Sequence, residues 1–289
     1  MGFRIKEKQL QGLLSSRGDL SHYSINRDWF LGFVEAEGSF IGRGKKPPIF
    51  EITQHSSDLT LFHALQRWLG AGTVRVSRRK DGRESVVYTL RGKDNLRKHL
   101  IPIPECSLPD TEKFKNSFLP WCDDHFPNVK LGEKESNLSR NWLVGFTDGD
   151  GSFYTTIRKQ DDYRIRFQFQ AVFDLVQRSN LSKEKDGERR SSLLSRIADT
   201  HFSEANRALI NRVGNDSMDR VRIVSNSCLH RHVIPLFQNK LQTRKEIQFL
   251  LFQDAVEFIK NREHLEPRNG EEIMAFKERY KEWQQRHSS

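Results

Sequence analysis

The sequence predicts an α+β fold with pseudo-two-fold symmetry, in which one αββαββα unit is present twice. Two observations lead to this prediction. A segment at 27–40 returns at 140–153, and after each copy the hydrophobic pattern changes between helical and strand spacing in the same order. With 289 residues, the chain is long enough for two units of about 100–200 residues each. We therefore expect two similar halves.

The repeated segment aligns without a gap and keeps its acidic residues. Seven of its 14 positions are identical, and Glu35 and Glu37 fall on Asp148 and Asp150. Further matches follow in the same order: FEITQ at 50–54 with FDLVQ at 173–177, and LRKHLIP at 96–102 with LHRHVIP at 229–235. The sequence thus divides into a first repeat at 1–125, a linker at 123–136 and a second repeat at 137–289 that ends in further helices.

Helical and strand patterns alternate along the first half. Leu59, Phe62 and Leu65 have the spacing of one helix face, and Gly70 can end that helix. Asp81-Gly82 is a turn signal between two strand patterns. The expected elements are a helix at 27–37, strands near 39–45 and 49–54, a helix at 56–70, and strands at 73–79 and 85–90.

The second half repeats this order with a longer hairpin. A charged stretch at about 178–190 reads as a loop. The expected strands lie near 152–159, 163–176, 207–213 and 218–224, and two amphipathic helices at 243–262 and 270–286 close the chain.

Composition limits the classes of partner. The formal net charge of +10 favours a polyanion, either nucleic acid or an anionic membrane surface. No apolar run approaches the roughly 18 residues of a membrane span, so we expect no membrane insertion. Three scattered cysteines, Cys106, Cys122 and Cys228, form neither a disulfide framework nor a zinc pattern. A reducing compartment is the simpler expectation.

Four acids stand where a helix disfavours them. Glu35, Glu37, Asp148 and Asp150 lie at the C-terminal ends of the two predicted motif helices, where negative charge opposes the helix dipole. A compensating cation is needed, and oxygen ligands suit Mg²⁺. Small residues one turn apart, in Gly32-x3-Ala36 and Gly145-x3-Gly149, allow the helices to approach closely. The alternative is two ordinary helix ends with solvated acids; the presence of the same features in both copies favours the metal site.

The two repeated segments contain FLGFVEAEG at 30–38 and LVGFTDGDG at 143–151. These two stretches resemble the two motifs of LAGLIDADG homing endonucleases in their monomeric two-repeat form. The resemblance covers about 27–260. It implies a saddle of two antiparallel four-stranded sheets, with the motif helices packed at the interface. It also implies catalytic Mg²⁺ bound by Glu37 and Asp150, with Ala36 and Gly149 included in the metal site. We expect Mn²⁺ to substitute, and Ca²⁺ to support binding without efficient cleavage.

The same resemblance assigns further roles. Glu35 and Asp148 resemble the structural helix-end acids of the family. Gln54 and Gln177 resemble its water-organising position, with a surface glutamine as the alternative. Lys240 resembles its basic residue near the active site; Lys245 and Arg244 stay open as alternatives, and Ser107 in the matching slot implies only one lysine.

Strand alternation predicts a polar sheet face for DNA. In 163–177, arginine and glutamine alternate with apolar residues, and such side chains suit base edges in the major groove. The alternative is a merely solvated face; the Arg/Gln bias in a chain of charge +10 favours DNA. The predicted DNA-binding residues are Arg43, Lys45, Arg75, Ser77, Tyr154, Thr156, Arg158, Arg164, Arg166, Gln168 and Gln170.

Together these patterns predict a monomeric endonuclease that cuts both strands of a long double-stranded DNA site. An intron maturase that binds intron RNA and a DNA-binding module without cleavage are the alternatives. Acids in both motifs favour cleavage. The resemblance further implies an intron-encoded protein of organellar genetic origin.

Overall fold

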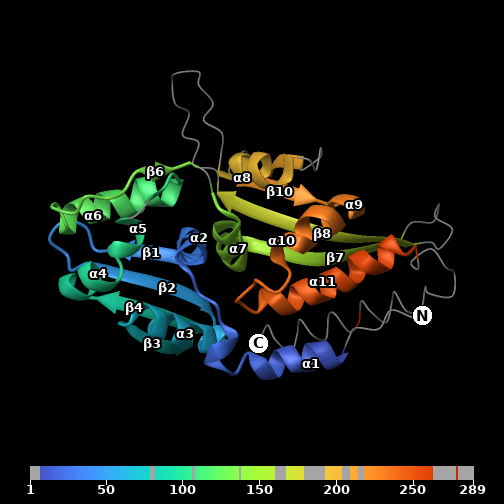
Figure 1. Cartoon of the computed structure of the whole chain (residues 1–289), viewed down its shortest axis with the longest axis horizontal. Coiled ribbons are helices and arrows are strands. Elements are labelled where there is room, and N and C mark those ends of the chain that lie inside the picture. The colour runs from blue at the N-terminus through green and yellow to red at the C-terminus, as the bar shows by residue number, and fades with distance from the viewer. Residues whose placement is uncertain are drawn as a thin grey trace, which may run out of the picture.

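The computed structural model describes residues 7–78, 82–105, 108–136, 138–159, 167–178, 193–203, 209–213, 218–262 and 278. It confirms the α+β class and the two-repeat architecture. Two four-stranded sheets have the strand orders β1-β2-β4-β3 and β7-β8-β10-β9, and every neighbouring pair within them is antiparallel. The sheets lie on either side of helices α2 and α7, which meet at the centre of the molecule (Figure 1).

The first half follows the predicted order. Its elements are α1 (Glu7–Ser16), α2 (Arg27–Glu37), β1 (Gly38–Ile41), β2 (Ile49–His55), α3 (Leu59–Leu69), β3 (Thr73–Arg78), β4 (Glu84–Arg91), α4 (Lys93–His99), α5 (Pro102–Glu105), β5 (Leu108–Pro109), a π-helical turn at Phe114–Phe118, α6 (Leu119–His125) and β6 (Lys134–Glu135). Short 3₁₀ turns lie at Leu20–His22 and Ser56–Asp58.

The second half repeats the unit. Its elements are α7 (Arg140–Asp150), β7 (Gly151–Lys159), β8 (Phe167–Arg178), α8 (Leu193–Phe202), β9 (Leu209–Val213), β10 (Met218–Ile223), α9 (Asn226–Cys228), a π-helical turn at Leu229–Val233, α10 (Ile234–Phe237) and α11 (Lys245–Lys260). The sequence predicts the loop at about 178–190, but Arg178 is the last residue of β8. The rest of that loop, the strand residues 163–166 and, apart from Glu278, the predicted helix at 270–286 lie outside the described residues.

The two motif helices begin and end in the same way. Asn26 caps α2 by accepting the Trp29 amide hydrogen, and Ser139 caps α7 through the Trp142 amide. Each helix passes directly into a strand through an extended glycine, Gly38 (φ −71°) or Gly151 (φ −79°). At Gly38, an added Cβ would lie 2.7 Å from the carbonyl oxygen of Val34. Lack of room, not a left-handed backbone, therefore requires glycine at this junction.

Equivalent aromatic residues pack against the inner face of each sheet. Phe40 pairs with Phe50 across β1 and β2, with ring centroids 5.5 Å apart, and Phe153 pairs with Phe173 across β7 and β8 at 5.1 Å. Helix α6 and the turn before it cover the first sheet, and α11 covers the second (Figure 1). The apolar sides of the strands are thereby buried, and the opposite sides are left for polar residues.

Two boundaries within the described residues differ from the sequence prediction by more than two residues. Strand β1 ends at Ile41 instead of 45, because Gly42 (φ +88°) and Gly44 (φ +61°) adopt left-handed conformations that end the strand. The helix expected at 56–70 begins as a 3₁₀ turn and ends, as predicted, at Gly70 with φ +74°. Among the described helices, none combines the length and apolar character needed to cross a membrane.

Candidate active site

The site begins at the crossing of α2 and α7. A Cβ on Gly32 would overlap the backbone of Trp142, and a Cβ on Gly145 would overlap the backbone of Trp29. One turn later, a Cβ on Gly149 would collide with Ala36 and lie 3.1 Å from Glu37 Cγ. The helices are therefore in backbone contact, and their acidic ends come together as the small-residue spacing predicted.

Glu35 and Asp148 are buried anchors. Glu35 accepts hydrogen bonds from the Thr111 hydroxyl at 2.5 Å and the Lys113 amide at 3.3 Å. Asp148 accepts from the Thr243 hydroxyl at 2.7 Å and from the amides of Gln242 and Thr243. Burial raises the pKa of both carboxyl groups. With their oxygens occupied inside the protein, these acids hold loops against the helix ends.

Glu37 and Asp150 are only half-buried and lie two residues beyond the anchors. Burial raises the pKa of both, and for Glu37 the neighbouring Asp150 charge adds to the effect. Gln54 Nε2 donates to Glu37 Oε1 at 3.1 Å, so this predicted pair is brought together. Gln177 has no hydrogen bond to Asp150 within the described part of the chain, although it occupies the equivalent strand position.

Two lysines, not one, stand beside the acids. Lys113 Nζ donates to the Val34 and Ala36 carbonyls at 3.2 and 3.0 Å. Lys245 Nζ donates to the Thr147 carbonyl at 3.1 Å and to the Gly149 carbonyl. Each ammonium therefore satisfies terminal carbonyls of one motif helix, where the dipole favours positive charge. Burial lowers the pKa of both, that of Lys245 to about 8.

Lys245, one of the two alternatives to Lys240, is the residue that contacts the C-terminal carbonyls of α7. Lys240 is half-buried in the turn before the site, and its carbonyl accepts from the Gln242 side chain at 3.1 Å. The signal missed in the sequence is Thr-x-Lys, present as Thr111-x-Lys113 and Thr243-x-Lys245. Its threonine lies nine residues after Pro102 in the first repeat but eight after Pro235 in the second. An alignment that matches the two prolines therefore places Lys113 and Lys245 one position apart.

The predicted DNA-binding side chains occupy the outer sides of the sheets or their ends. Arg75 and Arg158 are exposed on β3 and β7, and Gln168 and Gln170 are half-buried on β8. The remaining described ones are Ser77 and Thr156, which are half-buried, and Arg43 and Lys45, which are exposed beyond the end of β1. Arg164 and Arg166 lie outside the described residues.

Tyr154 belongs to a network on the same face. Its hydroxyl donates to Asp174 Oδ2 at 3.0 Å, and Arg220 Nε donates to Asp174 Oδ1 at 2.7 Å. Arg220 and Arg222 on β10 were missed by the sequence analysis, although DRVRI alternates as a strand with one basic face. The network fixes the direction of the Arg220 guanidinium, whose charge is balanced by Asp174.

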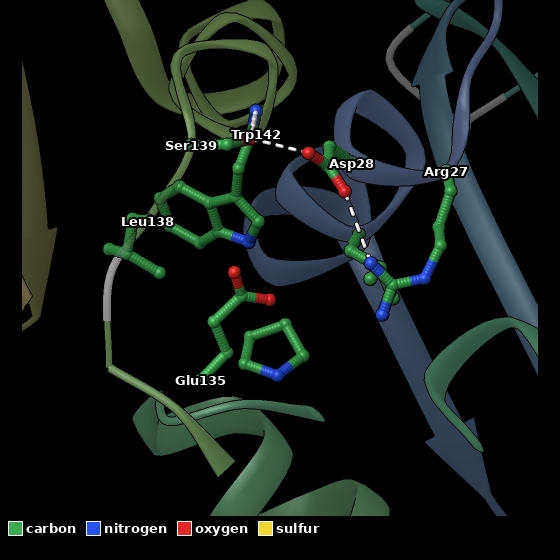
Figure 2. Close-up of a pocket in the computed structure, with 8 residues that line it drawn as sticks. Arg27, Asp28, Glu135, Leu138, Ser139 and Trp142 are labelled. Carbon is green, nitrogen blue, oxygen red and sulfur yellow. Dashed lines mark hydrogen bonds and ion pairs between the residues drawn. The ribbon is translucent and has the colours of Figure 1, made fainter. Parts of the chain in front are cut away.

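A small cavity lies at the other end of the motif helices (Figure 2). Its volume is about 10 Å³, room for one water. Trp142, Glu135 and Asp28 line it, and Ser139 donates to Asp28 at 2.6 Å. The indole Nε1 of Trp142 is buried without a hydrogen-bond partner in the described structure. This cavity is separate from the acids, which lie at the opposite helix ends.

The LAGLIDADG endonuclease family model matches residues 30–124 and 143–256. A probable intron-encoded endonuclease 4 from Neurospora crassa is 34% identical over 134 residues, covering 45% of this chain and 24% of that protein. A probable intron-encoded endonuclease Cox1-I1b from Schizosaccharomyces pombe is 24% identical over 158 residues, covering 44% and 40%. The chain thus spans less than half the length of these curated relatives.

Solved structures share the fold. The I-LtrWI LAGLIDADG homing endonuclease bound to target DNA superposes with a TM-score of 0.69 at 17% identity, covering 90% of this chain and 97% of that one. I-SmaMI bound to uncleaved DNA target in the presence of calcium ions gives 0.67 at 22% identity, covering 88% and 98%.

Proposed function

Because the chain belongs to the LAGLIDADG endonuclease family, we propose that it is a homing endonuclease that binds a long double-stranded DNA site and hydrolyses both strands. The observation that carries the proposal is the meeting of Glu37, Asp150, Lys113 and Lys245 at the α2–α7 crossing, between two polar sheet faces. The chain acts as a monomer in this proposal, since both motif helices belong to one polypeptide.

The donors at the crossing fit a divalent cation such as Mg²⁺. Glu37 and Asp150 are hard oxygen ligands whose pKa values are raised by burial and, for Glu37, by mutual repulsion. A cation is the partner that would restore both to the ionised form. In the described residues no three His, Cys, Asp or Glu side chains gather, so the other ligands would be phosphate oxygens and water. The carbonyls of Ala36 and Gly149 could join them only through the lone pair that the lysine hydrogen bonds leave open.

A bound divalent cation would supply a Lewis acid and lower the pKa of an attacking water. The protein side chains orient and balance charge around it. Gln54 fixes the direction of Glu37 through their 3.1 Å hydrogen bond. Each lysine ammonium has three donors and uses two on helix carbonyls. The third can reach a phosphate oxygen or order a water, where positive charge stabilises the developing negative charge.

The sheet faces provide the DNA contacts in this proposal. Arg75, Arg158, Gln168 and Gln170 carry the planar groups that read base edges, and Arg222 on β10 extends the set. Exposed lysines and arginines elsewhere contact phosphates, which fix position without specifying sequence. The solved relatives bound to DNA have the same fold. Two curated relatives are named as intron-encoded endonucleases, which supports an intron-encoded protein of organellar genetic origin.

The test separates cutting from binding. The protein is incubated with a randomised duplex library in Mg²⁺, Mn²⁺ or Ca²⁺, and the cut ends and the retained duplexes are sequenced. We expect cutting in Mg²⁺ and Mn²⁺, and retention without efficient cutting in Ca²⁺. Glu37→Gln and Asp150→Asn should remove cutting and keep retention, because affinity rests mainly on the sheets. Asp199→Asn, at an exposed acid on α8, is the control that should cut normally.

Retention without cutting by the parent in every metal would support the binding-only alternative, and retention of RNA in preference to duplex DNA would support the maturase. Full cutting by the double variant Glu37→Gln/Asp150→Asn would refute the proposed site.

A further inference from the structure

Two loops bring the lysines to the site, and each loop contacts an arginine of the other repeat. The first lysine loop is 108–113, and the second lysine loop is 241–245. Arg17, at the end of α1 in the first repeat, contacts the second lysine loop. Arg196, on α8 in the second repeat, contacts the first lysine loop.

Arg17 is buried, with 8% of its side chain exposed. Its Nη1 donates to the Thr243 carbonyl at 2.7 Å and to the Gln242 carbonyl at 3.3 Å. Its Nη2 donates to Asp58 at 2.7 Å, and Asp58 also accepts the Arg244 amide at 2.7 Å. The guanidinium and its carboxylate partner together hold two successive peptide units of the second lysine loop, 242–243 and 243–244.

The other side of those peptides belongs to the active site. The amides of Gln242 and Thr243 donate to Asp148 at 2.9 and 3.0 Å, while their carbonyls accept from Arg17. Residues 242 and 243 are thus held from both sides, by the motif-helix anchor and by the opposite repeat. Without Arg17 the two buried carbonyls would lose a charged donor, at a cost that would favour a changed loop conformation.

The first lysine loop has an equivalent arrangement. Arg196 Nη1 donates to the Asp110 carbonyl, and its Nη2 donates to the Ser136 carbonyl at 2.6 Å. Asp110 immediately precedes Thr111, which donates to Glu35. Asp110 and Gln242 occupy the same place in their loops, each one residue before the threonine of Thr-x-Lys. A planar guanidinium with several fixed donors suits this bridging of two carbonyls.

We infer that Arg17 and Arg196 are reciprocal positioning residues, each of which holds the active-site lysine of the opposite repeat in register with its motif helix. Within the described structure, neither arginine hydrogen-bonds to the four acids of the motif helices. The consequence is that each half-site is complete only when the other repeat is docked against it. The predicted effect on cleavage rests on the proposed function, whereas the effect on the lysines does not.

The test uses the full chain with Arg17→Lys and Arg196→Lys, which keep the positive charge but replace the planar, spaced donors of the guanidinium with a single ammonium. Arg67→Lys, at an exposed arginine on α3, is the matched control. First, Lys113 and Lys245 are acetylated with acetic anhydride in the DNA-free protein, and the modification of each is followed by mass spectrometry. Second, the nicking rate of each strand of a cleaved duplex is measured separately.

Arg17→Lys should speed acetylation of Lys245 alone, and Arg196→Lys that of Lys113 alone. Each should slow the nicking of a different strand by roughly tenfold, the effect of losing one charge-assisted contact. A general loss of stability would affect both lysines and both strands together. If Arg17→Lys fails to fold, Arg17→Gln/Asp58→Asn, which removes both charges of the buried pair, replaces it.

Unchanged acetylation in both variants would overturn the inference, as would equal effects on the two lysines. Equal slowing of both strands would do the same. If the parent cuts no duplex, the proposed function fails, and the acetylation experiment still decides the role of the arginines.

Discussion

Adding one methyl group at Gly145 should disrupt the centre of the molecule. Gly145 lies in the middle of α7. Its ideal Cβ would overlap the carbonyl oxygen of Trp29, and it would lie 2.7 Å from the carbonyl carbon and 3.0 Å from the Phe33 amide nitrogen. These are backbone atoms of α2, so no side chain can turn away to make room. The two helices would have to move apart.

The expected magnitude follows from two opposing effects. Replacing glycine by alanine inside a helix favours folding by about 1 kcal/mol. Overpacking a close contact costs about 1–3 kcal/mol, and rigid backbone on the far side places this contact at the upper end. The net destabilisation is then about 2 kcal/mol, which lowers the midpoint of thermal unfolding by roughly 4–8 °C in a chain of this size.

Gly12→Ala supplies the control. Gly12 lies in α1, and a Cβ there would meet nothing within 4 Å. This variant keeps the favourable helix effect without the clash, so its unfolding midpoint should stay level or rise. Both variants are measured by thermal and urea unfolding. An unchanged midpoint for Gly145→Ala would refute backbone contact between α2 and α7.

Four further predictions use other parts of the structure. Trp29→Phe should destabilise the protein by about 1.5–3 kcal/mol more than Trp142→Phe does. The reason is that the Trp29 indole donates to Asp148 at 2.8 Å, while the Trp142 indole has no partner in the described structure. Equal midpoints of urea unfolding for the two variants would contradict this. The folded-state pKa of Asp58 is raised from 3.8 to about 6 by burial, so the native state binds more protons than the unfolded state between those values. The stability of the parent relative to Asp58→Asn should therefore fall by roughly 1–3 kcal/mol as pH rises through that interval, and a flat difference in denaturation free energy would exclude it. Gln168→Ala should relax base preference at a few neighbouring positions of one half-site, by about 1–3 kcal/mol per lost bidentate contact; an unaltered cleavage profile across a target library would remove Gln168 from base recognition. The two strands should be cut at unequal rates, so a nicked circle should accumulate transiently on a supercoiled target, and direct conversion to linear DNA would argue against unequal half-sites.

The features that the sequence predicted share a local physical origin. The acids and small residues of α2 and α7 lie within one helical segment each, and helix geometry alone places them on the crossing face. Strand alternation likewise predicted the buried side of β8, where Phe169 and Phe173 are in the core. Patterns of this kind need no knowledge of distant contacts.

The features that the sequence did not predict depend on contacts between distant segments. Lys245 reaches the Thr147 carbonyl across 98 positions of the chain, and the one-residue difference in spacing after Pro102 and Pro235 hid its likeness to Lys113. Arg17 meets Thr243 across 226 positions. No periodicity records such a pairing, because it is produced by the docking of one repeat on the other.

The acidic ends of the two motif helices differ by one methylene in each side chain, and their hydrogen bonds differ as well. The motif-helix backbones are related by the pseudo-two-fold axis, but the first has glutamates where the second has aspartates. Asp148 is short, and it lies where the Trp29 indole can donate to it at 2.8 Å. Glu35 accepts from the Thr111 hydroxyl, as Asp148 does from the Thr243 hydroxyl, but the indole of Trp142 is left without an equivalent partner in the described structure. The added length at Glu37 likewise accompanies a hydrogen bond from Gln54 that Asp150 does not receive from Gln177 within the described residues. The duplication preserved charge at these four positions, while the difference in side-chain length gave each repeat its own hydrogen-bond network.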